Sequence, residues 1–138
     1  MPCQTASALA RSRIQQANEC LYSAEFELES KGFKTAASRS YFCIFHAMRA
    51  VLALDKFDTK KHSGSIIIAA FRKKHIKSGL FPAKFSDIIE DAFKIRDDSD
   101  YEDFYVISKD DVAVQIANAK IFLAAVESYI SEKLVPES

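Results

Sequence analysis

Arginine and histidine side chains interrupt an otherwise apolar segment, "AASRSYFCIFHAMRAVLAL", residues 36–54, which carries Arg39, His46 and Arg49. A guanidinium group holds phosphate or carboxylate through a planar fork of N–H donors. An imidazole titrates near neutrality and can accept or donate a proton. These residue types therefore indicate phosphate binding or acid–base chemistry. The structural alternative is that His46 donates to a backbone carbonyl and Arg39 extends into solvent.

The spacing of the segment places its polar groups together if it is a helix. At about 100° per residue, Arg39 and His46 point the same way. They share that side with the small residues Ala36, Cys43 and Ala50. The opposite side carries the large apolar residues expected to face the core, namely Ala37, Tyr41, Ile44, Phe45, Met48, Val51 and Leu52. Small residues let another backbone come close, so the two polar groups are predicted to reach a partner or a ligand.

A later segment has the same combination of an apolar stripe and an arginine. Phe85, Ile89, Ala92 and Phe93 share a helical face with Arg96, and Asp100 follows one turn later. Burying an arginine is costly unless it is paired. A salt bridge from Arg96 to Asp100 is one interpretation. A guanidinium placed at a cleft to hold a phosphate is the other.

Two further groups of basic residues are candidates for binding anions. His62, in "KKHSG", precedes a predicted helix start, where an anion can bind, although an exposed loop histidine is the simpler interpretation. A basic run follows, consisting of Arg72, Lys73, Lys74, His75 and Lys77. Such a run is usually a solvated face, but it is also the best local nucleic-acid footprint in the chain.

Composition limits the classes of protein to consider. The chain has 138 residues, 19 basic and 19 acidic, so its formal net charge is zero and only a local patch could attract nucleic acid. We expect one domain, 1–138, in the cytoplasm and without a membrane segment. The three cysteines show no CxxC spacing and are expected to be reduced thiols. P-loop, GxGxxG, HExxH, GxSxG and zinc-ligand patterns are absent, so no cofactor or metal is predicted.

The apolar periodicity predicts helices throughout. They are expected at residues 7–31, 34–55, 63–78, 82–99 and 109–134, with Ser63 and Ser108 as N-caps. No alternating strand pattern is present. The predicted fold is all-α, an up-and-down antiparallel bundle of four to five helices.

Four motifs in this order, "AASRSYFCIFHAMRAVLAL", "KKHSG", "KSGLFP" and "AFKIRDDSDYEDF", resemble the HEPN family of small helical proteins. The resemblance covers about residues 8–132 and is strongest to standalone bacterial and archaeal members. It implies a helical bundle that forms a homodimer and is often encoded beside a minimal nucleotidyltransferase as a toxin–antitoxin pair. It also implies that many members are metal-independent endoribonucleases, whereas others bind nucleotides or act as non-catalytic partners.

The family's active motif is an arginine, a polar residue and, after four to six further residues, a histidine. Arg96 and Asp97 match its beginning, but the chain has Tyr101, Glu102 and Asp103 where the histidine would stand. Arg39 and His46 satisfy the spacing on the earlier helix, with Ser40 in the polar position. The resemblance therefore implies a degraded catalytic pair. It also implies that Asp100 and Tyr101 position a substrate, and that Tyr101 or Tyr105 could accept a nucleotide from the partner enzyme.

Three hypotheses follow from the sequence. The first is a dimeric module that binds RNA or nucleotide and pairs with a nucleotidyltransferase. The second is a metal-independent ribonuclease in which His46 moves a proton at the ribose 2′-hydroxyl and Arg96 stabilises phosphate charge, with Arg39 as a further candidate. The third is a structural dimer whose polar groups only fix the interface.

Overall fold

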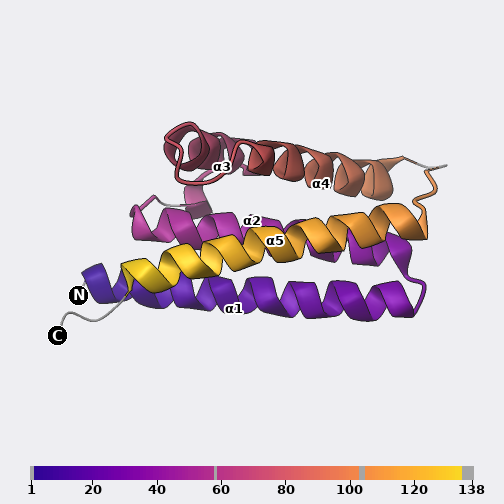
Figure 1. Ribbon diagram of the computed structural model, residues 1–138, viewed down its shortest axis with the longest axis horizontal. Helices are drawn as coiled ribbons and strands as arrows, with labels where there is room; N and C mark the ends of the chain where they lie inside the picture. The colour runs from indigo at the N-terminus through magenta and orange to yellow at the C-terminus, as the bar shows by residue number, and fades with distance from the viewer. Residues whose placement is uncertain (1, 58, 103–104, 135–138) are drawn as a thin grey trace.

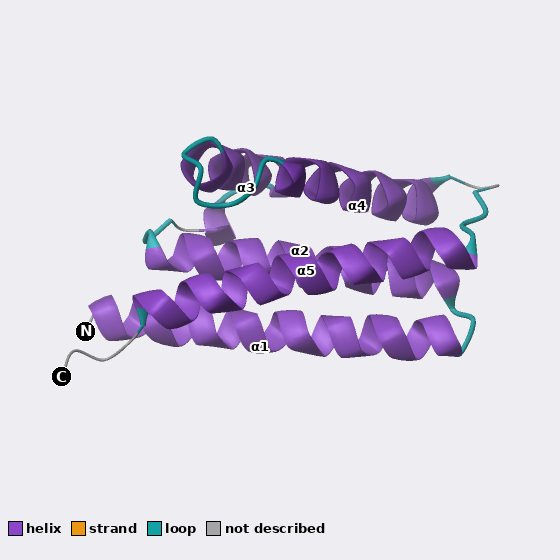
Figure 2. Ribbon diagram, in the orientation of Figure 1, coloured by secondary structure: helices purple, strands orange, loops and turns teal. Residues whose placement is uncertain are grey.

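Helices account for nearly all of the structure, a computed structural model that describes residues 2–57, 59–102 and 105–134. Its α-helices are α1 (Pro2–Glu29), α2 (Phe33–Leu54), α3 (Gly64–Phe71), α4 (Lys84–Tyr101) and α5 (Lys109–Lys133). A 3₁₀ turn, Thr59–Lys61, precedes α3, and a π-helical turn, Arg72–Ile76, continues it. No strand occurs within the described ranges (Figure 2). The predicted all-α fold is confirmed.

The four long helices run up and down along the molecule, and α2 lies at their centre. It contacts α1, α3, α4 and α5. Figure 1 shows α1 and α4 on opposite sides of the pair formed by α2 and α5, with the short α3 beside the beginning of α4. Because α2 is covered on several sides, its surface outside these contacts is a narrow strip. That strip carries the polar residues singled out in the sequence.

Small side chains bring α1 and α2 close together. Ala10, Ala17 and Ala24 recur every seven residues on α1, and Ala36, Cys43 and Ala50 recur every seven on α2; all six are completely buried. A seven-residue repeat keeps one seam facing a neighbouring helix. The sequence analysis assigned the small residues of α2 to a partner or ligand. The backbone that approaches them is α1 of the same chain, and this corrects the expectation.

Two predicted N-caps are confirmed, and the end of the third helix differs from the prediction. The Ser63 hydroxyl accepts from the Ile66 N–H at 3.4 Å, and the Ser108 hydroxyl accepts from the Asp111 N–H at 3.0 Å. The α-helix that was predicted to reach residue 78 ends at Phe71. The wider turn that follows closes with a bond from the Lys77 N–H to the Arg72 carbonyl at 2.9 Å.

Candidate functional site

Arg96 lies near the end of α4, with its guanidinium group above two aromatic rings of α2. The guanidinium carbon is 5.6 Å from the ring centre of Tyr41 and 5.4 Å from that of Phe42. Nε lies 2.9 Å from the Asp100 carboxylate, so the predicted ion pair is confirmed, although the N–H does not point directly at that oxygen. The aromatic faces and the carboxylate together offset the cost of partly burying the charge.

Aromatic rings extend from Arg96 along the outer strip of α2 towards His46. The ring centres of Phe42 and His46 are 6.1 Å apart, and those of Phe45 and His46 are 6.2 Å apart. Tyr41 and Phe45 stack at 5.8 Å. Arg96 and His46 therefore belong to one surface, with the Phe42 ring between them. We call this surface, formed by Tyr41, Phe42, Phe45, His46, Arg49 and Arg96, the α2–α4 face.

His46 is held by an arginine that the sequence analysis did not choose. Arg49 donates through a terminal nitrogen to Nδ1 of His46 at 3.0 Å and through Nε to the Thr59 hydroxyl at 3.2 Å. Arg13 of α1 donates to the Arg49 carbonyl at 3.2 Å. Because an arginine can only donate, Nδ1 of His46 must be the acceptor, and the ring proton is on Nε2.

The same surroundings set the charge of His46. Burial, together with the positive charges of Arg49 and Arg13, lowers the pKa of His46 to about 4. The imidazole is therefore uncharged at neutral pH, and its basic nitrogen already accepts a hydrogen bond. The expectation that this histidine titrates close to neutrality does not hold here, because two arginines replace the water and carboxylates that would favour the charged form.

Other predicted site residues lie away from these two. Arg39 is exposed and close enough to Cys20 of α1 to lower the pKa of that thiol, against the larger raising effect of burial. Asp97 is exposed, and Tyr101 is 69% exposed at the end of α4. Tyr105 is half-buried. Asp103, at one position where the family histidine would stand, lies outside the described residues.

His62 and Lys74 meet around the ring of Phe57. The His62 ring stacks on Phe57 with centres 4.9 Å apart, and the Lys74 ammonium lies 5.2 Å from the Phe57 centre. Both side chains come from exposed positions, as does Lys73. They form a small basic group beside the start of α3. His62, Lys73 and Lys74 of the predicted basic residues are therefore at the surface.

Lys77 of that basic run is exposed, but Arg72 and His75 are not part of a solvated face. Arg72 is half-buried and donates to the Ser86 carbonyl at 3.2 Å. His75 is only 3% exposed, and its Nε2 lies 2.6 Å from the Asp55 carboxylate. His75 follows Phe71 by four residues and lies on the same side of the helical segment, where their rings are 5.5 Å apart. The interpretation of His75 as an exposed residue was wrong.

Sequence reasoning missed Arg13 and left Arg49 out of the site. Arg13 stands between Ala10 and Ala17, at the spacing of the buried stripe, and is itself 2% exposed. A charged residue inside such a stripe is a signal that could have identified it. Arg49 follows His46 by three residues, which makes the two neighbours on a helix surface.

The described residues contain no group of three or more His, Cys, Asp or Glu placed to hold a metal ion. Within the same ranges, none of the helices is long and apolar enough to cross a bilayer.

The fold and the site define a small helical bundle with a cationic and aromatic surface on its central helix. The HEPN domain family model matches residues 10–129, and the chain belongs to this family. It is 29% identical to a Methanocaldococcus jannaschii protein named "Putative toxin MJ0142" over 86% of this chain and 75% of that protein. It is 28% identical to a "UPF0332 protein" of Thermotoga maritima, over 86% of this chain and 88% of that protein. A "UPF0332 protein" of Archaeoglobus fulgidus is also 28% identical, over 87% of this chain and 94% of that protein.

Proposed function

We propose that this protein binds RNA or a nucleotide on the α2–α4 face and acts as the HEPN component of a toxin–antitoxin type module. Guanidinium groups beside accessible aromatic rings are one means by which proteins hold single-stranded nucleic acid, because the cations bind phosphates and the rings stack with bases. On this face Phe42 and Phe45 are half-buried and offer partial ring surface, whereas Tyr41 is buried. Arg96, held over Tyr41 and Phe42 and still 26% exposed, is the observation that carries this proposal.

The state of His46 supports binding rather than catalysis. A general acid must carry a proton at the working pH, and the pKa of His46, lowered to about 4, leaves it neutral. A general base needs a free nitrogen, whereas Nδ1 accepts from Arg49. The absence of the family histidine after Arg96 also supports binding rather than catalysis. In this proposal His46 contributes to the shape of the surface and orients Arg49.

Removal of the Arg96 charge tests this proposal. Arg96→Ala should weaken the binding of a fluorescent single-stranded RNA by about tenfold or more, because a charge-assisted contact is lost. The slope of log affinity against log salt should fall by about 0.7, the value for one phosphate contact on a single strand. Fluorescence anisotropy in EDTA measures both. Arg11→Ala, which removes an exposed arginine of α1, is the matched control and should bind as the wild type does.

The same samples decide between binding and cleavage. We expect the RNA to remain intact in EDTA. Cleavage by the wild type that is lost in His46→Ala would favour the metal-independent ribonuclease instead. If the wild type neither binds nor cuts RNA, and no nucleotide binds, the proposal fails and the structural dimer remains.

A nucleotidyltransferase partner is part of the proposal. The toxin name of the M. jannaschii relative is consistent with a two-component module. The exposed Tyr101 hydroxyl could accept a nucleotidyl group from a nucleoside triphosphate, with pyrophosphate leaving. Incubation with a nucleotidyltransferase encoded beside the gene should add this mass to the wild type and not to Tyr101→Phe, as seen by mass spectrometry. An unmodified wild type, or an equally modified variant, would exclude Tyr101 as the acceptor.

A further inference from the structure

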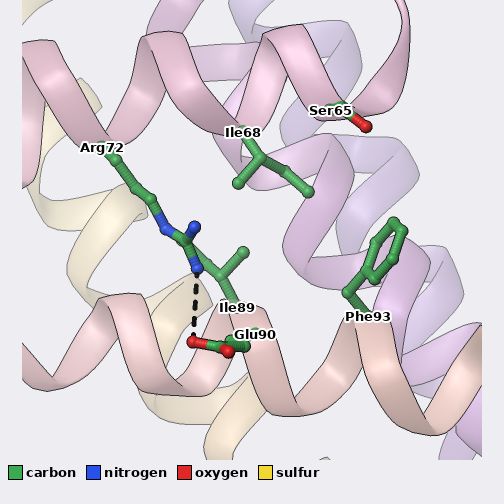
Figure 3. A pocket seen from close by; sticks show the side chains of 6 residues that line it. All are labelled: Ser65, Ile68, Arg72, Ile89, Glu90 and Phe93. Atoms are coloured by element: carbon green, nitrogen blue, oxygen red, sulfur yellow. Dashed lines mark ion pairs between the residues drawn. The ribbon is translucent and has the colours of Figure 1, made fainter.

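A hollow of about 270 Å³ lies between α3 and α4, outside the surface described above, and is lined by Ser65, Ile68, Arg72, Ile89, Glu90 and Phe93. Ile68 and Ile89 are almost completely buried and form an apolar floor. Figure 3 shows Arg72 and Glu90 together on one side and the Phe93 ring on the other. The volume is just below the range of about 300–1,000 Å³ that is typical of drug-sized ligands, so a small ring system suits it.

The polar side of the hollow has unused hydrogen-bonding capacity. One terminal nitrogen of Arg72 donates to the Ser86 carbonyl and lies 4.0 Å from the Glu90 carboxylate, at the limit of an ion pair. Nε of Arg72 is buried, so a ligand reaches Arg72 through the outer part of its guanidinium group; the side chain as a whole is 34% exposed. The Glu90 side chain is 75% exposed. The Arg72 guanidinium group, a donor, and the Glu90 carboxylate, an acceptor, therefore lie side by side at the wall of the hollow.

These features select one chemical class of ligand. A free phosphate would meet the Glu90 carboxylate and be repelled. A purely apolar molecule would remove water from Arg72 and Glu90 without replacing its hydrogen bonds. A flat, neutral ring with adjacent donor and acceptor groups satisfies the floor, the aromatic wall and the polar pair together. Each RNA base has such an edge, and exposed bases are recognised through this edge and by stacking on aromatic side chains.

We propose that the hollow between α3 and α4 is a nucleobase pocket, in which Phe93 stacks with the base and Arg72 and Glu90 bond its edge. Phe93 also joins the pocket to the α2–α4 face, because its ring lies 6.0 Å from that of Tyr41, beneath Arg96. Phe93 and Arg96 are three residues apart on α4 and so are surface neighbours. The phosphate attached to a bound base is then held by Arg96; this part rests on the proposed function.

Nucleosides separate the base pocket from phosphate binding. The full chain, labelled with ¹⁵N, is titrated with adenosine, cytidine, guanosine and uridine, which lack phosphate. Saturable shifts are expected at the amides of Ser65, Ile68 and Phe93. Phe93→Ala should weaken binding by about tenfold, the effect of losing one stacked base. Glu90→Gln, which replaces one acceptor with a donor, should weaken it by about fivefold or more.

Two controls make the outcome specific. Tyr22→Ala removes an exposed aromatic ring of α1 and should leave nucleoside binding unchanged. The second control is the ligand itself: the nucleosides lack phosphate, so their binding to the wild type is measured separately from the loss of RNA binding in Arg96→Ala, and failure of the RNA proposal can be told apart from failure of the pocket. The side chains of Phe93 and Glu90 are at least one-third exposed, so both variants are expected to fold, which circular dichroism verifies.

Three results would overturn the pocket. The first is the absence of saturable shifts with all four nucleosides. The second is that Phe93→Ala and Glu90→Gln both bind nucleosides as tightly as the wild type. The third is that benzene, which offers no hydrogen bonds, binds as tightly as the nucleosides, since the polar pair would then have no role.

Discussion

The contact between Arg49 and His46 has a different consequence for the charge of each side chain. Arg49 remains a cation while it donates to His46, and its charge, with that of Arg13, keeps the imidazole neutral. The neutral ring then accepts the Arg49 N–H and helps fix the guanidinium. The histidine is thereby changed from a proton carrier into a support for a cation. This division of roles leaves a neutral histidine on the cationic α2–α4 face.

The lowered pKa of His46 predicts how stability depends on pH. In the unfolded chain the imidazole gains its proton near pH 6.5, whereas in the folded protein it stays neutral until about pH 4. Between these values the unfolded state binds more protons, so His46 makes the protein less stable as the pH falls, by up to about 3 kcal/mol. His46→Gln should therefore lose less unfolding free energy than the wild type between about pH 7 and about pH 4.5.

Urea unfolding followed by circular dichroism measures this difference. The two proteins are compared at each pH, so the contributions of the other titrating groups largely cancel. If the unfolding free energies of wild type and His46→Gln fell by the same amount between about pH 7 and about pH 4.5, the lowered pKa of His46 would be contradicted.

At the level of helices, the seam between α1 and α2 allows the strip of polar residues to form. Alanine and cysteine side chains at a seven-residue repeat let the two backbones approach closely. Arg13 can then reach across to the Arg49 carbonyl. A wider separation would take the Arg13 charge away from His46, so the small residues influence the site although they do not touch a ligand.

Enlarging one of these small residues should destabilise the bundle. Ala17 is completely buried in the seam, and Ala17→Leu adds volume that neighbouring helices cannot accommodate without shifting. We expect a loss of about 1–3 kcal/mol in the free energy of unfolding. Glu19→Leu, an exposed position of the same helix, should change stability by less than about 0.5 kcal/mol. Equal unfolding curves for the two variants would show that the seam is loosely packed.

The sequence predicted the features that depend on interactions between residues close together in the chain. The helical fold and the caps at Ser63 and Ser108 depend on residues three or four apart and were predicted, and the Arg96–Asp100 pair was one of the two interpretations given for Arg96. His75 is four residues after Phe71, which was a local sign that it shares the apolar face, but its partner Asp55 lies twenty residues earlier and could not be predicted from spacing. The Arg13–Arg49 contact likewise joins two helices. These parts of the site required the packing of the whole chain.

At the level of the whole molecule, large exposed aromatic residues suggest contact between copies. Near-zero net charge offers little electrostatic opposition to such association. Two aromatic regions compete as the interface: the exposed Tyr22 and Phe26 on α1, and the half-buried rings of the α2–α4 face together with the exposed Phe93. We propose that the α2–α4 face is the interface, because the family resemblance implies that two copies of the Arg96 motif meet across a cleft. A two-fold axis there would place the same surface of each copy against the other.

A charge placed on each surface decides between the two regions. Phe42 is half-buried, and Phe42→Glu should convert a dimer to a monomer, because pairing would remove apolar contact area and force a carboxylate from each copy to lose its water. Phe26→Glu, at a position 60% exposed on α1, is the matched control and should remain dimeric. Sedimentation velocity over a range of concentrations gives the masses. A wild type that is monomeric throughout would contradict the dimer, and a dimer lost in Phe26→Glu but kept in Phe42→Glu would move the interface to α1.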